Sequence, residues 1–120
     1  MAYSLRSNLK TVYFNNTIRE IGFSSFASSS NLKNIYLNDG LKTIGSQAFS
    51  NCNYLEYVVI PDTVKYIGSH AFTNVNIFSN NTYRPDTWAE DFAIGNNVAI
   101  YFKHTWYYDE NGIPTPKDNI

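Results

Sequence analysis

Three segments of this 120-residue chain repeat one short phrase at intervals of 23 residues. They read IREIGFSSF (18–26), LKTIGSQAF (41–49) and VKYIGSHAF (64–72). In each segment a glycine directly follows an isoleucine, and an aromatic residue stands four positions after the glycine. A fixed period of this length is typical of a solenoid, in which every repeat forms one turn that stacks on the next. Stacked turns build extended surfaces, which suit binding better than catalysis.

Within one repeat, the apolar pattern predicts a short parallel strand. Leu-x-x-Val-x-Ile (55–60) recurs as Leu-x-x-Ile-x-Leu (32–37), and alternation along a strand turns the last two apolar residues of each inward. Gly45 and its equivalents follow a second extended segment, where we expect a sharp bend that needs a residue without Cβ. SQAFSN (46–51) and SHAFTN (69–74) are too short for a long helix, so one turn of α- or 3₁₀-helix is expected.

The regularity fails after Phe72, and the following residues predict a C-terminal cap with one helix and a strand. Residues 74–79 are expected to form a strand that is reached by a shortened return. Residues 87–95 predict a true helix, because Thr87 and Glu90 have capping-box spacing and a glycine ends the segment.

After that helix, we expect a strand at 98–102 and a polar-tipped, hairpin-like ending at 105–114. We therefore divide the chain into repeats at 1–79, about three and a half turns, and a capping segment at 80–120.

At the other end, the repeat is already in register at Ala2, which leaves the first predicted turn without a cap. Uncapped strand edges invite pairing with another chain. The chain is therefore expected to be part of a longer repeat array, or to bury its first turn by end-to-end self-association.

The pattern Ile-Gly-x-x-Ala-Phe-x-x-Cys-x-x-Leu-x-x-Val-x-Ile-Pro (44–61) resembles the BspA-type leucine-rich repeat, and the resemblance covers roughly residues 1–79. The departures, at packing and turn positions, are Ser29 and Val75 in place of Cys52, and Asn38 in place of Pro61. The resemblance implies a right-handed leucine-rich repeat solenoid (a β/α superhelix), found on secreted or cell-surface proteins and associated with adhesion. It implies no catalytic activity for the repeat itself.

Composition narrows the range of partners. The net charge is −1 and only 16% of residues are charged, so no general field attracts nucleic acid or anionic lipid. No apolar run approaches the roughly 18–20 residues that a membrane helix needs, so no membrane insertion is expected. A single cysteine, Cys52, excludes an intrachain disulfide.

The outward positions of the main strands form two predicted ladders, which are our candidate binding residues: Thr11, Asn34 and Tyr57, then Tyr13, Tyr36 and Val59. Tyrosines stacked on an exposed face suit recognition of a protein or a glycan, because each offers a flat apolar ring and a hydroxyl. The alternative is that these side chains only pack across strands and stabilise the sheet. A third ladder, Arg19, Lys42 and Lys65, is read as protection against edge aggregation more readily than as a site for an anion.

No residues predict catalysis, a cofactor or a metal. Cys52 takes a slot that holds Ser29 and Val75 in other turns, which indicates packing. His70 and His104 lack ligand spacing, and DENG (109–112) predicts a turn more than a calcium loop.

The sequence therefore predicts a non-catalytic recognition or adhesion module of a cell-surface or secreted protein, which binds protein or glycan through its strand face. Two alternatives stay open: a structural spacer or assembly element of a longer array, and an accessory domain of a larger protein.

Overall fold

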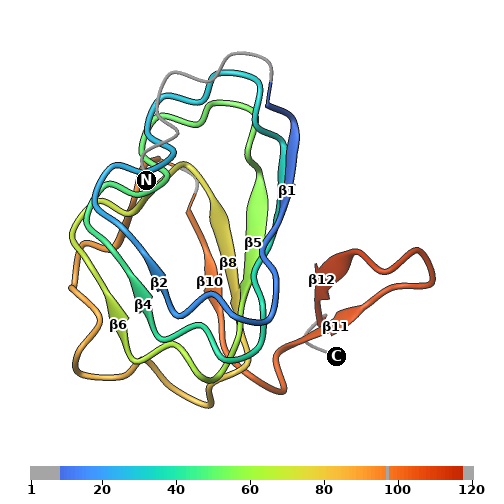
Figure 1. Cartoon of the computed structure of the whole chain (residues 1–120). Helices are drawn as coiled ribbons and strands as arrows, with labels where there is room; N and C mark the ends of the chain where they lie inside the picture. Colours follow the sequence, from blue (N-terminus) through green and yellow to red (C-terminus); the bar gives the residue numbers. More distant parts are fainter. Residues whose placement is uncertain (1–8, 97, 118–120) are drawn as a thin grey trace.

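The computed structural model describes residues 9–96 and 98–117, in which the chain winds into a β-solenoid of about four turns (Figure 1). The main wall consists of β1 (Thr11–Tyr13), β3 (Asn34–Tyr36), β5 (Tyr57–Ile60), β8 (Asn76–Ser79) and β10 (Ile100–Tyr101). A second wall consists of β2 (Glu20–Ile21), β4 (Thr43–Ile44) and β6 (Tyr66–Ile67). Strands β7 (Phe72–Thr73) and β9 (Ala93–Ile94) form a separate short parallel pair. The predicted solenoid of short parallel strands is confirmed.

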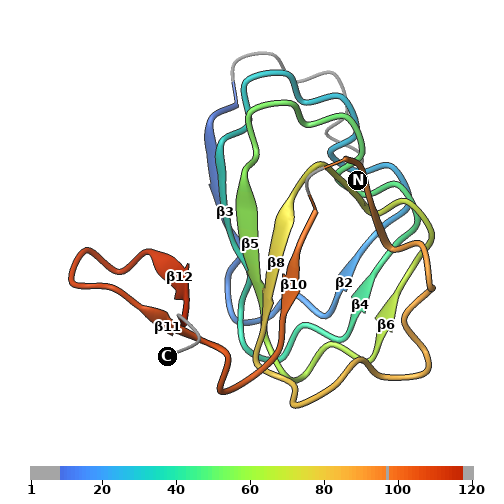
Figure 2. The same cartoon turned by 180° about the vertical axis from the view of Figure 1, so that it is seen from behind.

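The strand registers follow the repeat. In the second wall Ile21 pairs with Ile44, and Ile44 with Ile67. The strands of the main wall lie side by side in Figure 2, but they are hydrogen-bonded as two sheets, β1–β3 and β5–β8–β10. In the second sheet Tyr57 pairs with Asn76, so the return before β8 is shorter than the repeat, as predicted.

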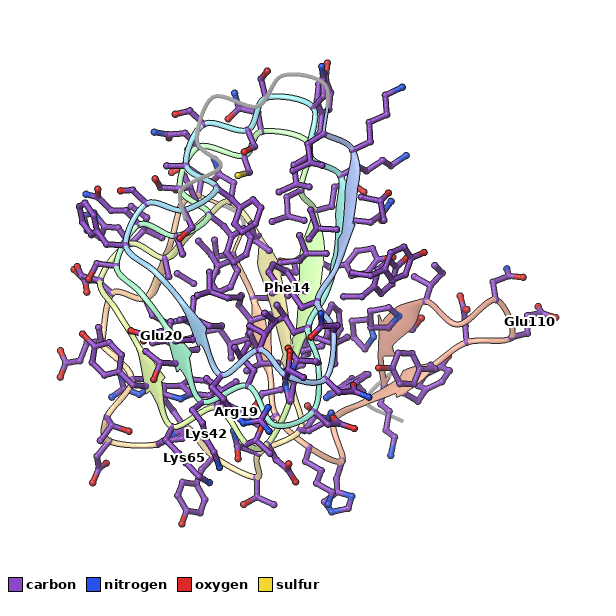
Figure 3. All side chains as sticks on the ribbon, viewed as in Figure 1. Phe14, Arg19, Glu20, Lys42, Lys65 and Glu110 are labelled. Carbon is purple, nitrogen blue, oxygen red and sulfur yellow. The ribbon has the colours of Figure 1, made fainter. Side chains whose placement is uncertain are left out.

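Stacked side chains fill the interior between the walls, and two of these stacks come from the repeated phrase. The isoleucine stack of the second wall is buried, and the phenylalanine stack runs beside it. The rings of Phe26 and Phe49 lie 5.2 Å apart and those of Phe49 and Phe72 lie 5.4 Å apart, both nearly parallel. Phe14, labelled in Figure 3, meets Phe26 edge-on. The repeated residues are therefore the buried ones.

The predicted helical turns at 46–51 and 69–74 are wrong, because the described residues contain no helix. Alternate backbone N–H groups bond in different directions: that of Ala48 donates to Gly45 within the turn (3.2 Å), and that of Gln47 donates to Ser69 of the next turn (3.0 Å). In a helix all N–H groups point the same way along the axis, so N–H groups that alternate between two directions do not fit one. The left-handed backbone of Gln47 (φ 58°) also breaks a helix.

The expected reason for the repeated glycine needs a correction too. Gly45 and Gly68 do not take the left-handed conformation. A Cβ built on Gly68 would lie 2.4 Å from the backbone nitrogen of Ser46, and one on Gly45 would lie 2.7 Å from that of Phe23. These glycines are needed because neighbouring turns approach closely there.

The predicted cap helix at 87–95 is also wrong. The Thr87 hydroxyl, which would have capped it, donates instead to the carbonyl of Lys65 in the preceding turn. Trp88 forms a parallel bridge with Ile67, and its indole N–H donates to the carbonyl of Val64 (3.2 Å). Stacking as a further turn also gives this segment backbone hydrogen bonds to the preceding turn, such as that from the Ala89 N–H to the carbonyl of Ile67 (2.8 Å), which a helix would forgo.

After β10 the chain leaves the stack as the antiparallel hairpin of β11 (Trp106–Tyr108) and β12 (Pro114–Pro116), which confirms the predicted ending. Its turn is organised by a side-chain oxygen of Asp109, which accepts the N–H groups of Asn111 (2.8 Å) and Ile113 (2.9 Å). The division at residue 79 stays a prediction, and parallel pairing continues past it to β10. The uncapped first turn lies outside the described residues. No helix in the described part of the chain could cross a membrane.

Candidate functional site

The six predicted binding residues lie on the main wall, in β1, β3 and β5. They are Thr11, Tyr13, Asn34, Tyr36, Tyr57 and Val59. The structure brings Thr11 opposite Asn34 and Tyr13 opposite Tyr36. The two tyrosine rings stack at 4.6 Å with an angle of 11° between their planes. Tyr13 is 74% exposed and Tyr36 is 46% exposed, so this pair forms an open aromatic step on the surface.

The hairpin divides the predicted site, because it projects beside the main wall (Figure 1) and lines two hollows together with residues of β5 and β8. Trp106 anchors it: its indole N–H donates to the carbonyl of Ser79 (2.9 Å), and its ring meets Phe78 edge-on at 5.5 Å. Tyr57 and Val59 are therefore half-buried beside the hairpin, while Tyr13 and Tyr36 stay in the open.

Two hollows separate the hairpin from the wall. The hairpin hollow, about 240 Å³, is lined by Ile35, Tyr36, Leu37, Asp39, Tyr57, Val59, Pro61, Asn80, Tyr108, Asn111, Gly112, Ile113 and Pro114. The edge hollow, about 420 Å³, is lined by Glu56, Tyr57, Asn74, Asn76, Phe78, Tyr101, Pro114 and Pro116. Tyr57 and Pro114 line both, so they mark the boundary between the two.

One carboxylate lines each hollow, Asp39 in the hairpin hollow and Glu56 in the edge hollow. Burial raises the pKa of Tyr57, and Tyr36, Glu56 and Asp109 raise it further. Burial, and then Asp39, raises the pKa of Tyr108 in the same way. No Lys, Arg or His is among the described residues that line either hollow. The local charge is therefore negative although the whole chain is nearly neutral.

Sequence reasoning missed the hairpin's part in this surface. Tyr108, Ile113 and Pro114 line the hairpin hollow but stand outside the repeat. The only sequence signals were the aromatic run at 106–108 and the turn after it, which predicted a hairpin. Nothing local indicates where that hairpin docks.

The basic ladder stacks as its spacing predicts. Figure 3 shows Arg19, Lys42 and Lys65 lying on consecutive turns, next to one another. The Arg19 guanidinium donates to the carbonyl of Asn16 (2.8 Å), and the Lys65 ammonium donates to that of Asp62 (3.3 Å). Backbone carbonyls thus hold both end cations.

The described residues show no arrangement for nucleophilic or metal chemistry. Cys52 is fully buried, and burial raises the pKa of its thiol to about 11, so it stays protonated. His70 and Asp91 approach to 3.3 Å, but the hydroxyl of Ser69 donates to Asp91 and not to the histidine. A catalytic serine donates its hydroxyl to the histidine, so this arrangement does not activate Ser69. No three metal-ligating side chains gather in the described part.

The comparisons with known proteins agree with this architecture. The sequence profile of the BspA type leucine rich repeat region matches residues 1–97 in six copies. The chain belongs to this family, whose repeats are generally non-catalytic scaffolds, are often involved in binding or adhesion, and are typical of surface or secreted proteins. No characterised protein and no solved structure gives a significant match to the chain.

Proposed function

We propose that this chain is a recognition module of a cell-surface or secreted protein, which binds a protein or glycan through the outer face of its main wall. The observation that carries the proposal is the open stack of Tyr13 and Tyr36, beside a hollowed surface completed by the hairpin. Tyrosine rings give contact area at a low cost in conformational entropy, which is why they are frequent in binding surfaces.

The competing function is a structural spacer. In that case the two tyrosines only stabilise the sheet, with a stacking contribution of about 1 kcal/mol. The two functions therefore differ in what removing the rings changes: affinity for a ligand, or stability alone.

The test compares the double variant Tyr13→Ala/Tyr36→Ala with the double variant Tyr66→Ala/Tyr83→Ala, which removes two exposed tyrosines outside this face. Binding is measured on an array of immobilised extracellular proteins and oligosaccharides, and stability by thermal unfolding. We expect at least about a tenfold loss of binding only for the first variant, with a nearly unchanged melting temperature. A fall in stability without any change in binding would favour the spacer.

A further inference from the structure

The two hollows contain the same kinds of side chain, although different segments build them. The hairpin hollow has the carboxylate of Asp39 and the amides of Asn80 and Asn111. The edge hollow has the carboxylate of Glu56 and the amides of Asn74 and Asn76. Each also has tyrosine hydroxyls, so a ligand there would meet both hydrogen-bond donors and acceptors.

The amides of the edge hollow point to a ligand that accepts hydrogen bonds. The side-chain oxygen of Asn76 accepts the N–H of Ala99 (3.1 Å), and that of Asn74 accepts the N–H of Asn96 (3.2 Å). These bonds hold both amides in place and leave their NH₂ groups without a partner in the described part of the chain. A ligand hydroxyl can accept from such a group and donate to the nearby carboxylate.

Aromatic rings supply the apolar part of each hollow. Tyr36, Tyr57 and Tyr108 line the hairpin hollow. Phe78 and Tyr101, stacked at 5.0 Å, line the edge hollow together with Tyr57. Flat rings beside fixed polar groups match a sugar ring, which has an apolar C–H face and a rim of hydroxyls.

The charge of the lining residues narrows the class of ligand further. Each hollow has one carboxylate and no cationic lining residue within the described chain, which opposes a sulfated, phosphorylated or acidic ligand. Basic side chains would suit the carboxylates, but they carry only donors and would leave the amide NH₂ groups unmatched. A neutral polyhydroxyl chain satisfies both kinds of group.

We propose that the two hollows bind successive units of one neutral oligosaccharide, which crosses the boundary at Tyr57 and Pro114. This assignment rests on the proposed recognition function and names its ligand class. It extends the contact from the open stack to the space under the hairpin, because Tyr36 lines the hairpin hollow and Tyr13 lines neither hollow.

The test titrates the full chain with four neutral probes: cellotetraose, maltotetraose, chitotetraose and mannotetraose. Tetragalacturonic acid and an arginine–proline heptapeptide serve as the acidic and basic comparison probes. Calorimetry and amide chemical shifts follow binding. We expect at least one neutral probe to bind with a Kd below about 5 mM and to shift amides of both hollows. Tyr57→Ala should weaken it at least about tenfold, while Tyr66→Ala on β6 should not.

A second variant, Ile113→Arg, fills the hairpin hollow from the exposed hairpin and keeps the test valid if Tyr57→Ala does not fold. It too should weaken the neutral probe at least about tenfold. The assignment is overturned if no neutral probe binds, or if either comparison probe binds more tightly. If it fails while Tyr13→Ala, which changes the ring outside both hollows, still weakens binding on the array, the recognition function stands and only the ligand class is wrong.

Discussion

Gly68 is buried against the backbone of the preceding turn, and its missing side chain sets how closely two turns can stack. Gly22, at the matching position of an earlier turn, is exposed, and its nearest neighbour for an added Cβ is the Ser25 hydroxyl at 3.3 Å. Glycine at this repeat position is therefore required for close stacking in one turn and not in the other.

The first prediction compares Gly68→Ala with Gly22→Ala. An added methyl at 68 forces two turns apart, so we expect a loss of about 2–3 kcal/mol in the free energy of unfolding, measured by urea denaturation. At 22 we expect less than about 1 kcal/mol, because a side-chain hydroxyl can move aside. Equal losses at the two positions would contradict the close-approach explanation.

The second prediction concerns Cys52, whose thiol pKa is raised by burial from 9.0 to about 11. The Cys52 thiol ionises at a lower pH in the unfolded chain than in the folded one. The protonated, buried thiol therefore stabilises the fold fully below pH 9, and this contribution is lost as the pH rises through 11. The loss should reach about 2–3 kcal/mol. Cys52→Val, which places in this slot the residue that Val75 supplies in a later turn, should remove this part of the decline in urea titrations at successive pH values. Superimposable pH profiles would refute it.

At the scale of elements, the hairpin β11–β12 is held to the solenoid chiefly by Trp106, which is 8% exposed. The indole N–H bond to Ser79 and the edge-on contact with Phe78 join segments that are far apart in the sequence. Tyr107, the next residue, is 48% exposed. One residue in this strand is therefore an anchor and its neighbour is not.

The third prediction follows from that contrast. Trp106→Ala should release the hairpin and speed amide hydrogen exchange at 106–116 by at least about tenfold, because local opening no longer breaks a buried contact. Exchange in β4 and β6 should stay within about twofold. Tyr107→Ala is the control and should leave exchange in the hairpin unchanged. Uniformly faster exchange in all strands would mean that the hairpin and solenoid unfold as one unit.

For the whole molecule, apolar stacking and backbone hydrogen bonds between turns hold the structure together, and ion pairs contribute little. Within the described residues one ion pair occurs, between the half-exposed side chains of His70 and Asp91. The exposed cations Arg19, Lys42 and Lys65 repel one another mildly.

The fourth prediction is that sodium chloride hardly affects thermal unfolding near neutral pH. Raising its concentration from about 0.05 M to about 0.5 M should change the melting temperature by less than about 4 °C, since an exposed pair contributes at most about 1 kcal/mol. The direction should be upward, because salt screens the cation ladder. A marked fall in the melting temperature would reveal stabilising ion pairs and refute the prediction.

The sequence by itself determined the period, the inward residues and the pairing of β1 with β3, because each turn repeats the same burial pattern. It also determined the family, through the fixed positions of Ile44, Gly45 and Phe49. These features are local or repeat once per turn, so periodicity alone reveals them.

Only the tertiary structure decided the rest. The helices expected at 46–51 and 87–95 do not form, because backbone groups and Trp88 bond to the neighbouring turn instead. Local sequence cannot weigh a cap against contacts made 22 or 24 residues away. The hollows at Tyr57 depend on where Trp106 docks the hairpin, 27 residues from its partner Ser79. Such contacts lie outside the repeat, and no period predicts them.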